Sequence, residues 1–145
     1  MIHLDTNYLI GLLVKGSSQA LDVDAWLVSG ELIATSAIAW TEFLNGPVTP
    51  REVGHAGGIM QSGIIPFGSA EAVLAADLFN KTGRRRGSRF DCLIGATAIL
   101  AKAEIATINR TDFTVFIPHG LKLAVALPAA NPYAEPPTSP GGHSG

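Results

Sequence analysis

The sequence predicts an α/β domain in which a central, mostly parallel sheet of four to five short strands is flanked by helices. Two observations support this fold class. Short apolar runs of strand length alternate along the chain with longer stretches of helical periodicity. Residues that favour helix N-termini also stand where an apolar run ends, as in Asp5-Thr6-Asn7 and at Ser36. Repeated strand-to-helix junctions are typical of parallel sheets.

In the first half of the chain, apolar runs predict strands and periodic stripes predict the helices between them. Residues 1–4 are expected to form a strand, and residues 8–14 a short helix. Leu21, Ala25 and Val28 recur at helical spacing and predict a helix over residues 19–28 that packs on this stripe. The next expected elements are a strand at 31–35, a helix capped by Ser36 that ends near Leu44, and a helix at 49–61.

A short strand followed by a strong amphipathic helix is expected after residue 63. Residues 64–67 are expected to lie at a sheet edge, because Pro66 cannot donate a ladder hydrogen bond. Ser69 is expected to cap a helix over residues 70–82. The apolar residues of that helix are Val73, Leu74, Leu78 and Phe79.

The last third of the chain is organised around an apolar helix that begins at an acid. Ser88 stands three residues before Asp91, which is capping-box spacing, and the apolar run after Asp91 predicts a buried helix to about residue 103. Further strands are expected at 105–108 and 114–117, with 121–127 as another strand or a packed extension. We assign the domain to residues 1–127. Residues 128–145 are rich in Pro, Gly and Ser, and we expect a flexible tail there.

The composition excludes several functional classes. A net charge of −2 argues against binding nucleic acid through bulk charge. No apolar run reaches the roughly 18 residues of a membrane span, and the N-terminus has no secretory pattern. The single cysteine, Cys92, lies within the apolar helix, so we expect a core residue in a cytoplasmic protein rather than a nucleophile. Four histidines lack ligand spacing and are expected to be surface or structural residues: His3, His55, His119 and His143.

Four acids stand near strand ends or on helices: Asp5, Glu42, Asp91 and Asp112. Each has an ordinary explanation, because an Asp caps helices and turns and a helical Glu usually faces solvent. In a parallel sheet, however, the strand C-termini and the helix N-termini that follow share one rim, where ligands bind. Carboxylates gathered there need a counter-cation, and hard divalent ions such as Mg²⁺ or Mn²⁺ prefer oxygen ligands.

One basic cluster precedes Asp91. It contains Arg84, Arg85, Arg86 and Arg89. A run of charges is most simply a solvated loop. Its position beside an acid supports the alternative that these arginines hold the phosphates of a nucleic acid.

Four short motifs together resemble the PIN-domain ribonucleases and, among them, the VapC-type toxins of bacterial toxin–antitoxin modules. They occur in the order of that family, over roughly residues 1–125: Leu4-Asp5-Thr6-Asn7, Thr41-Glu42-Phe43, the run from Asp91 to Ala98, and the run from Ala106 to Phe113. The resemblance implies a PIN-like fold and a divalent-metal-dependent endoribonuclease. It also implies a cognate antitoxin protein and a homodimer as partners.

The resemblance assigns roles to individual residues. Asp5, Glu42, Asp91 and Asp112 become the acidic site, and Thr6 and Asn109 become supporting polar residues. We expect Asp5, Asp91 and Asp112 to hold Mg²⁺ or Mn²⁺, the last of them directly or through water. Glu42 is a further ligand or positions the attacking water.

Two alternatives remain open from the residues alone. One is a PIN-like module that binds RNA or protein without catalysis; the complete set of acids argues against it. The other is a phosphatase that forms a phosphoryl adduct on Asp5. The related haloacid-dehalogenase pattern has a second Asp two residues later, where this chain has Asn7.

Overall fold

Five short strands form one parallel sheet in the computed structural model, which describes residues 1–128. The strand order is β3-β2-β1-β4-β5, and every neighbouring pair is parallel. The predicted α/β class is therefore confirmed. The strands are β1 (Ile2–Leu4), β2 (Ile33–Ser36), β3 (Ile64–Ile65), β4 (Glu104–Ala106) and β5 (Lys122–Leu123).

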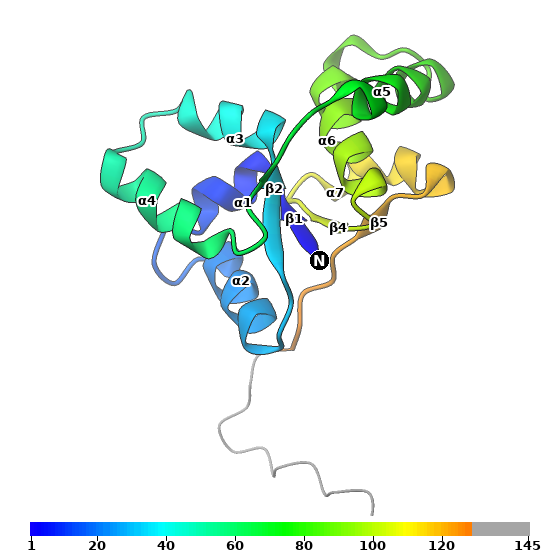
Figure 1. Cartoon of the computed structure of the whole chain (residues 1–145). Coiled ribbons are helices and arrows are strands. Elements are labelled where there is room, and N and C mark those ends of the chain that lie inside the picture. The colour runs from blue at the N-terminus through cyan, green and yellow to red at the C-terminus, as the bar shows by residue number, and fades with distance from the viewer. Residues whose placement is uncertain (129–145) are drawn as a thin grey trace, which may run out of the picture.

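Helices cover both sides of this sheet (Figure 1). In the view shown, α1 to α4 lie on one side of the strands, and α5, α6 and α7 lie on the other. The α-helices are α1 (Thr6–Gly11), α2 (Ser18–Val28), α3 (Ala37–Leu44), α4 (Pro50–Ile59), α5 (Ser69–Lys81), α6 (Arg89–Leu100) and α7 (Arg110–Phe113). Two 3₁₀ segments complete the described fold, η1 (Arg86–Ser88) and η2 (Thr114–His119).

The first strand of the sequence is the centre of the sheet. β1 pairs with β2 on one side and with β4 on the other, and all three of its residues are buried. A strand covered on both faces has no polar alternation, which explains the short apolar run at the start of the chain. The largest fully buried side chains surround it: Phe43, Phe113, Phe116, Ile2, Leu4, Leu9, Ile33, Leu78, Ile105 and Leu121.

The strand predicted at residues 114–117 is wrong. This segment is η2, and its Phe116 packs in the core beside Phe113, the last residue of α7 and the N-cap of η2. A 3₁₀ turn places residues three positions apart on one side, so both rings enter the core, with their centroids 5.9 Å apart and edge to face. Gly120, at φ 107°, ends the segment.

The predicted stripe of α2 is also wrong, although the helix itself is confirmed. Leu21 and Val28 are 60% and 90% exposed, whereas Val23 and Trp26 are buried. Trp26 fixes this rotation, because its indole N–H donates to the Val125 carbonyl at 3.0 Å. The larger aromatic ring, which also needs a hydrogen-bond partner, outweighs the aliphatic stripe.

In α5 the cap and one face differ from the prediction. Gly68 is the N-cap, and the Glu71 carboxylate accepts from its backbone N–H at 3.0 Å, so Ser69 is already inside the helix. Val73 is 73% exposed, while Leu78 is fully buried.

The end of the chain is only partly described. Apart from Pro128, the predicted tail at 128–145 lies outside the described residues. Between residues 1 and 128, no helix combines the length and the apolar character that a membrane crossing requires.

Candidate active site

Asp5 is held by a complete set of hydrogen bonds at the C-terminal end of β1. One carboxylate oxygen, Oδ1, accepts from the Thr6 backbone N–H at 2.8 Å. The other, Oδ2, accepts from the Thr107 hydroxyl at 2.7 Å and from the Asn7 side-chain amide at 3.3 Å. The residue is only 5% exposed. Asp5 thus starts α1 as a cap, and both of its oxygens have fixed directions.

Thr107 was not identified as a site residue from the sequence. β1 and β4 run in register, with Leu4 opposite Ala106, so the residues that follow the two strands are neighbours. The Asp5 backbone N–H donates to the Ala106 carbonyl at 2.9 Å, which brings Thr107 beside Asp5. The available signal was a polar residue directly after an apolar strand, the same position that Asp5 has after β1.

Asn109, predicted as a supporting residue, contributes its backbone rather than its side chain. Its N–H donates to the Thr107 hydroxyl at 3.1 Å, and the residue itself is exposed. Asn7 has the larger structural role. Its side chain accepts from the Ile108 N–H at 3.1 Å while donating to Asp5.

Glu42 reaches the same region from α3. Ser36 caps that helix as predicted, with its hydroxyl accepting from the Ala39 N–H at 3.0 Å. The Thr6 hydroxyl donates to the Glu42 carboxylate at 3.2 Å. Glu42 is half-buried, so it is not the ordinary solvent-facing helical acid. The structure thus brings Glu42 beside Asp5 and Thr6, from which it is separated by more than 30 residues of sequence.

Asp91 does not take part in a capping box. α6 begins at Arg89, two residues earlier than predicted, and Ser88 makes no side-chain cap. The Ser88 hydroxyl instead donates to the Arg85 carbonyl at 2.8 Å. Among the hydrogen bonds of residues 1–128, none involves the Asp91 carboxylate, which leaves this half-buried acid available to a ligand.

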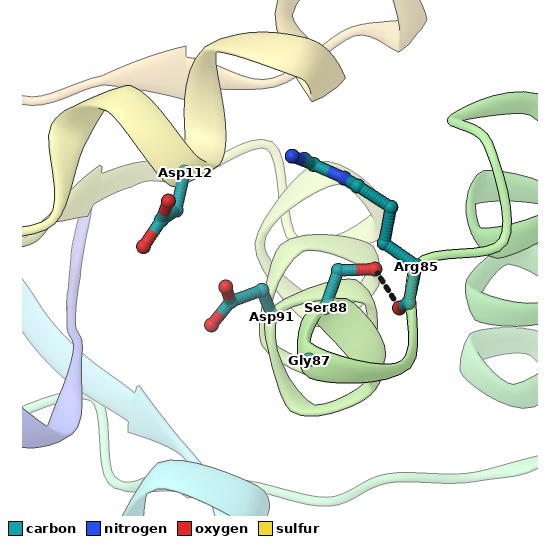
Figure 2. Close-up of a pocket in the computed structure, with 5 residues that line it drawn as sticks. All are labelled: Arg85, Gly87, Ser88, Asp91 and Asp112. Carbon is teal, nitrogen blue, oxygen red and sulfur yellow. Dashed lines mark hydrogen bonds between the residues drawn. The ribbon is translucent and has the colours of Figure 1, made fainter.

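Asp91 and Asp112 line one cavity of about 230 Å³. Its other lining residues are Arg85, Gly87 and Ser88. Figure 2 shows the Asp91 and Asp112 side chains on α6 and α7 with their carboxylates turned to one side, and the Arg85 side chain reaching across α6 toward α7. Within α6, Gly95 lies one turn after Asp91, and a side chain there would meet Phe116 of η2 at 3.4 Å. The absence of a side chain at Gly95 lets α6 pack closely against η2, the segment that follows α7.

The four acids interact electrostatically. Burial first, and then the negative charges of Asp5, Asp112 and Glu42, raise the pKa of Asp91, while Arg85 opposes the shift, and the net result is a pKa of about 6. Burial likewise raises the pKa of Asp5, against the lowering effect of its hydrogen bonds. The pKa of Glu42 rises through burial and through the charge of Asp5, against its bond from Thr6. A cation near Asp91 therefore relieves a repulsion that the fold creates.

The four arginines of the predicted cluster differ in what they contact. Arg84 and Arg89 are engaged with α5: the Arg84 Nε–H donates to Asn80 at 3.0 Å, and the Arg89 guanidinium lies 5.4 Å from the Phe79 ring centre. Arg85 lines the cavity, and Arg86 is exposed outside it.

These acids fit a hard divalent cation by chemistry and by charge. They offer only oxygen donors, and the raised pKa values of Asp91 and Glu42 show that part of the negative charge is not compensated. In the described part of the chain, no three His, Cys, Asp or Glu side chains lie close enough to hold one ion between them. An ion here would therefore be held by one or two carboxylates, as Mg²⁺ is when waters and substrate phosphate complete its ligands.

Other reactive side chains lie away from this chemistry. Cys92 is 1% exposed within the core, as predicted. His3 is equally buried in β1, its ring nitrogens have no hydrogen-bond partner, and burial lowers its pKa to about 4. It is a neutral structural residue. His55 is exposed and His119 half-buried, while His143 lies outside the described residues.

Comparison with known proteins identifies the fold family. The PIN domain family model matches residues 2–114, most of the chain. The chain belongs to the PIN domain family. This membership confirms the resemblance drawn from the four motifs and the predicted PIN fold. No curated protein sequence matches the chain.

Solved structures with the same fold come from toxin–antitoxin complexes. A toxin–antitoxin complex from Klebsiella pneumoniae has a chain 27% identical, with a TM-score of 0.60, covering 79% of this chain and 91% of its own. A chain of FitAcB from Neisseria gonorrhoeae is 22% identical, with a TM-score of 0.64, and the match covers 85% of this chain and 96% of that one. A chain of VapBC2 from Rickettsia felis, bound to a promoter DNA fragment, is 21% identical, with a TM-score of 0.63, and the match covers 86% of this chain and 98% of that one.

Proposed function

We propose that this PIN domain is a divalent-metal-dependent endoribonuclease and the toxin of a toxin–antitoxin module. One observation carries the proposal: the negative charges of Asp5, Glu42 and Asp112, from distant segments, act together with burial to raise the pKa of Asp91, which lines a cavity together with Asp112 and Arg85. Membership of the PIN family and likeness to chains of toxin–antitoxin complexes support it. The proposed place of action is the bacterial cytoplasm.

The proposed reaction is hydrolysis of an RNA phosphodiester. When bound, Mg²⁺ or Mn²⁺ supplies Lewis acidity and neutralises negative charge at the reacting phosphate. Asp5 and Asp91 would hold the ion directly, and Asp112 would hold it directly or through water. Glu42, fixed by Thr6, would be a further ligand or would orient the attacking water. The water oxygen bonds to phosphorus as the water gives up one proton, the ester P–O bond breaks, and the leaving oxygen takes up one proton, so that the protons balance.

The remaining parts of the proposal concern binding. Residues 84–89, here called the arginine segment, place positive charge at the edge of the cavity and hold the RNA backbone there. Thr6 and Asn109 support the acidic site, Asn109 through its backbone. A cognate antitoxin protein and a second copy of the chain are the proposed protein partners, by likeness to the toxin–antitoxin complexes.

The test incubates purified protein with total bacterial RNA and Mg²⁺ or Mn²⁺, and maps new 5′ ends by sequencing. Parallel reactions contain a chelator or the Asp91→Asn variant. Discrete, metal-dependent ends that vanish with the variant are the expected result, and they name the RNA target.

The same experiment separates the alternatives. Absence of new ends, together with absence of Mn²⁺ binding by calorimetry, contradicts the nuclease and favours a module that only binds. A covalent phosphoryl adduct on Asp5, detected by mass spectrometry, would instead favour the phosphatase chemistry.

A further inference from the structure

Arg85 differs from its neighbouring arginines in where its charge lies. The guanidinium groups of Arg84 and Arg89 contact α5, and Arg86 is exposed and is not among the residues that line the cavity. Arg85 lines the cavity and forms no ion pair within 4 Å among residues 1–128. Figure 2 shows its side chain reaching across α6 toward α7, while the carboxylates of Asp91 and Asp112 turn to the other side of the same site. A cation without an ion-pair partner among these residues thus lines the same cavity as two carboxylates.

The backbone around Arg85 is fixed. Its carbonyl accepts two hydrogen bonds from Ser88, from the hydroxyl at 2.8 Å and from the backbone N–H at 3.0 Å. On the other side, Arg84 adopts a left-handed conformation at φ 54°, and its N–H donates to the Phe79 carbonyl at 3.0 Å. A non-glycine residue in this region is costly and is kept where the surroundings demand it. The segment therefore fixes the point at which the Arg85 side chain leaves the backbone.

The charges of the cavity walls define what fits between them. A phosphodiester is an anion, so it is attracted to the guanidinium wall and repelled by the carboxylate wall. A divalent ion on the carboxylate side removes that repulsion and leaves the phosphate between the two cations. Arginine suits this position, because its planar fork binds two phosphate oxygens at once.

We propose that Arg85 is the arginine that contacts the scissile phosphate, and that Ser88 is the positioning residue that holds its backbone. This inference rests on the proposed nuclease function. It assigns to one residue of the arginine segment the contact with the reacting group, and leaves Arg84 and Arg89 with structural roles on α5.

A matched pair of variants tests the assignment: Arg85→Gln and Arg86→Gln remove the same charge from adjacent exposed positions. The first measurement is binding of a fluorescein-labelled, mixed-sequence 20-nucleotide RNA in EDTA, followed by anisotropy over a series of NaCl concentrations. Loss of one phosphate contact on a single strand reduces the slope of log K against log[NaCl] by about 0.7. Arg85→Gln is expected to show that reduction, and Arg86→Gln less than half of it.

The second measurement is single-turnover cleavage with Mg²⁺ at saturating protein, using a target from the RNA-end mapping. Arg85→Gln is expected to slow cleavage by about 100-fold or more, the size of a lost transition-state contact. Arg86→Gln is expected to slow it by less than about fivefold, the size of an exposed charge effect. Arg85→Lys keeps the charge but not the fork, and is expected to lie between the two.

The role of Ser88 is tested through its dependence on Arg85. Ser88→Ala is expected to lower the cleavage rate at saturation without changing the salt slope. In the double variant with Arg85→Gln, the loss is expected to equal that of Arg85→Gln alone, because Ser88 acts only through Arg85. Independent, additive losses would overturn the positioning role.

The outcomes distinguish this inference from the proposed function. Equal salt slopes and equal rates for Arg85→Gln and Arg86→Gln would overturn the assignment while leaving the nuclease intact. If the wild-type protein fails to cleave any RNA, the salt slopes in EDTA alone decide: a reduction confined to Arg85→Gln supports the contact, and equal slopes refute it. Circular dichroism of each variant checks that the fold is retained.

Discussion

The acids of the candidate site form two groups that are built differently, here called the closed wall, around Asp5, and the open wall, around Asp91 and Asp112. Around Asp5, Thr6, Asn7 and Thr107 form a closed network in which both carboxylate oxygens already accept hydrogen bonds. Around Asp91 and Asp112, the carboxylates face an open cavity, and the hydrogen bonds of residues 1–128 leave Asp91 without a donor. The first wall is rigid and internally satisfied, whereas the second carries charge that the fold does not neutralise.

This difference separates two kinds of acid that the sequence presents alike. A buried and fully bonded acid stabilises the fold and fixes geometry, so its removal leaves donors without a partner. A half-buried acid without donors weakens the fold through repulsion, and its presence is explained by a ligand. The two walls are therefore expected to respond in opposite directions when their acids are replaced.

The largest expected effect is the loss of RNA cleavage when Asp91 of the open wall is replaced. Asp91→Asn is expected to reduce RNA cleavage by at least about 100-fold, as removal of a main electrostatic group does. Since the amide also removes repulsion from Asp5, Asp112 and Glu42, the melting temperature of the metal-free variant at pH 7 is expected to equal or exceed that of the wild type. Single-turnover cleavage and thermal melts measure both. A lower melting temperature would mean that Asp91 has a structural role as a helix cap.

The second effect concerns a bound cation. At about 100 times its Kd, Mn²⁺ is expected to stabilise the wild-type protein by about 2.7 kcal/mol. The stabilisation is expected to disappear in Asp91→Asn and to weaken as pH falls toward 6, because protons compete for the Asp91 carboxylate, whose pKa is about 6. Thermal melts with and without Mn²⁺ at several pH values give the shift. Equal shifts in wild type and variant would place the ion elsewhere.

The third effect is a loss of stability when a hydrogen bond of the closed wall, around Asp5, is removed. Thr107→Val removes the hydroxyl that donates to Asp5 and accepts from the Asn109 N–H. It is expected to lower the free energy of unfolding by about 1–3 kcal/mol, the cost of losing the shortest hydrogen bond to a buried carboxylate that keeps only the 3.3 Å bond from Asn7 at that oxygen. Thr107→Ser keeps the hydroxyl, lacks the methyl group and serves as the control. Denaturant titration of both variants decides, and a loss in Thr107→Val no larger than that in Thr107→Ser would contradict the importance of the hydroxyl.

The smallest effect is the pH dependence of metal-free stability. The folded-state pKa of Asp91 is about 6, above its ordinary value of 3.8, so the folded protein binds more protons than the unfolded chain between these values. The free energy of unfolding therefore falls as pH rises from about 4 to about 6. The fall is expected to be smaller in Asp91→Asn. Denaturant titrations across this range test the sign, and a rise would contradict the proposed repulsion.

The parts of the site that sequence reasoning located are those tied to local pattern. Asp5 follows an apolar strand and Ser36 begins a helix, and both signals depend only on neighbouring residues. Thr107 was not identified from the sequence, because its hydrogen bond to Asp5 depends on the parallel pairing of β1 and β4. That pairing brings together positions about a hundred residues apart. The sequence contains no local mark of that pairing.

The mistaken elements have a similar cause. The segment at 114–117 has the β-branched and aromatic composition of a strand, but a 3₁₀ turn brings its Phe116 into the core on the same side as Phe113, three residues earlier. The rotation of α2 was decided by Trp26, whose partner carbonyl belongs to Val125. Ser88 likewise had capping-box spacing and bonded backward to Arg85 instead. In each case a tertiary contact overrode a local preference.

The central position of β1 has a consequence for how the molecule acquires its activity. The strand that carries Asp5 is made first, but its neighbour β4 is made about a hundred residues later, and the two must meet across that separation. Non-local pairing of this kind has a large entropic cost of loop closure, and it slows folding. A nascent chain that stops short of β4 contains Asp5, Glu42 and Asp91, yet lacks both Thr107 and Asp112. The residues of the candidate site are therefore all present only after synthesis of the domain is nearly complete, so the proposed activity would appear late.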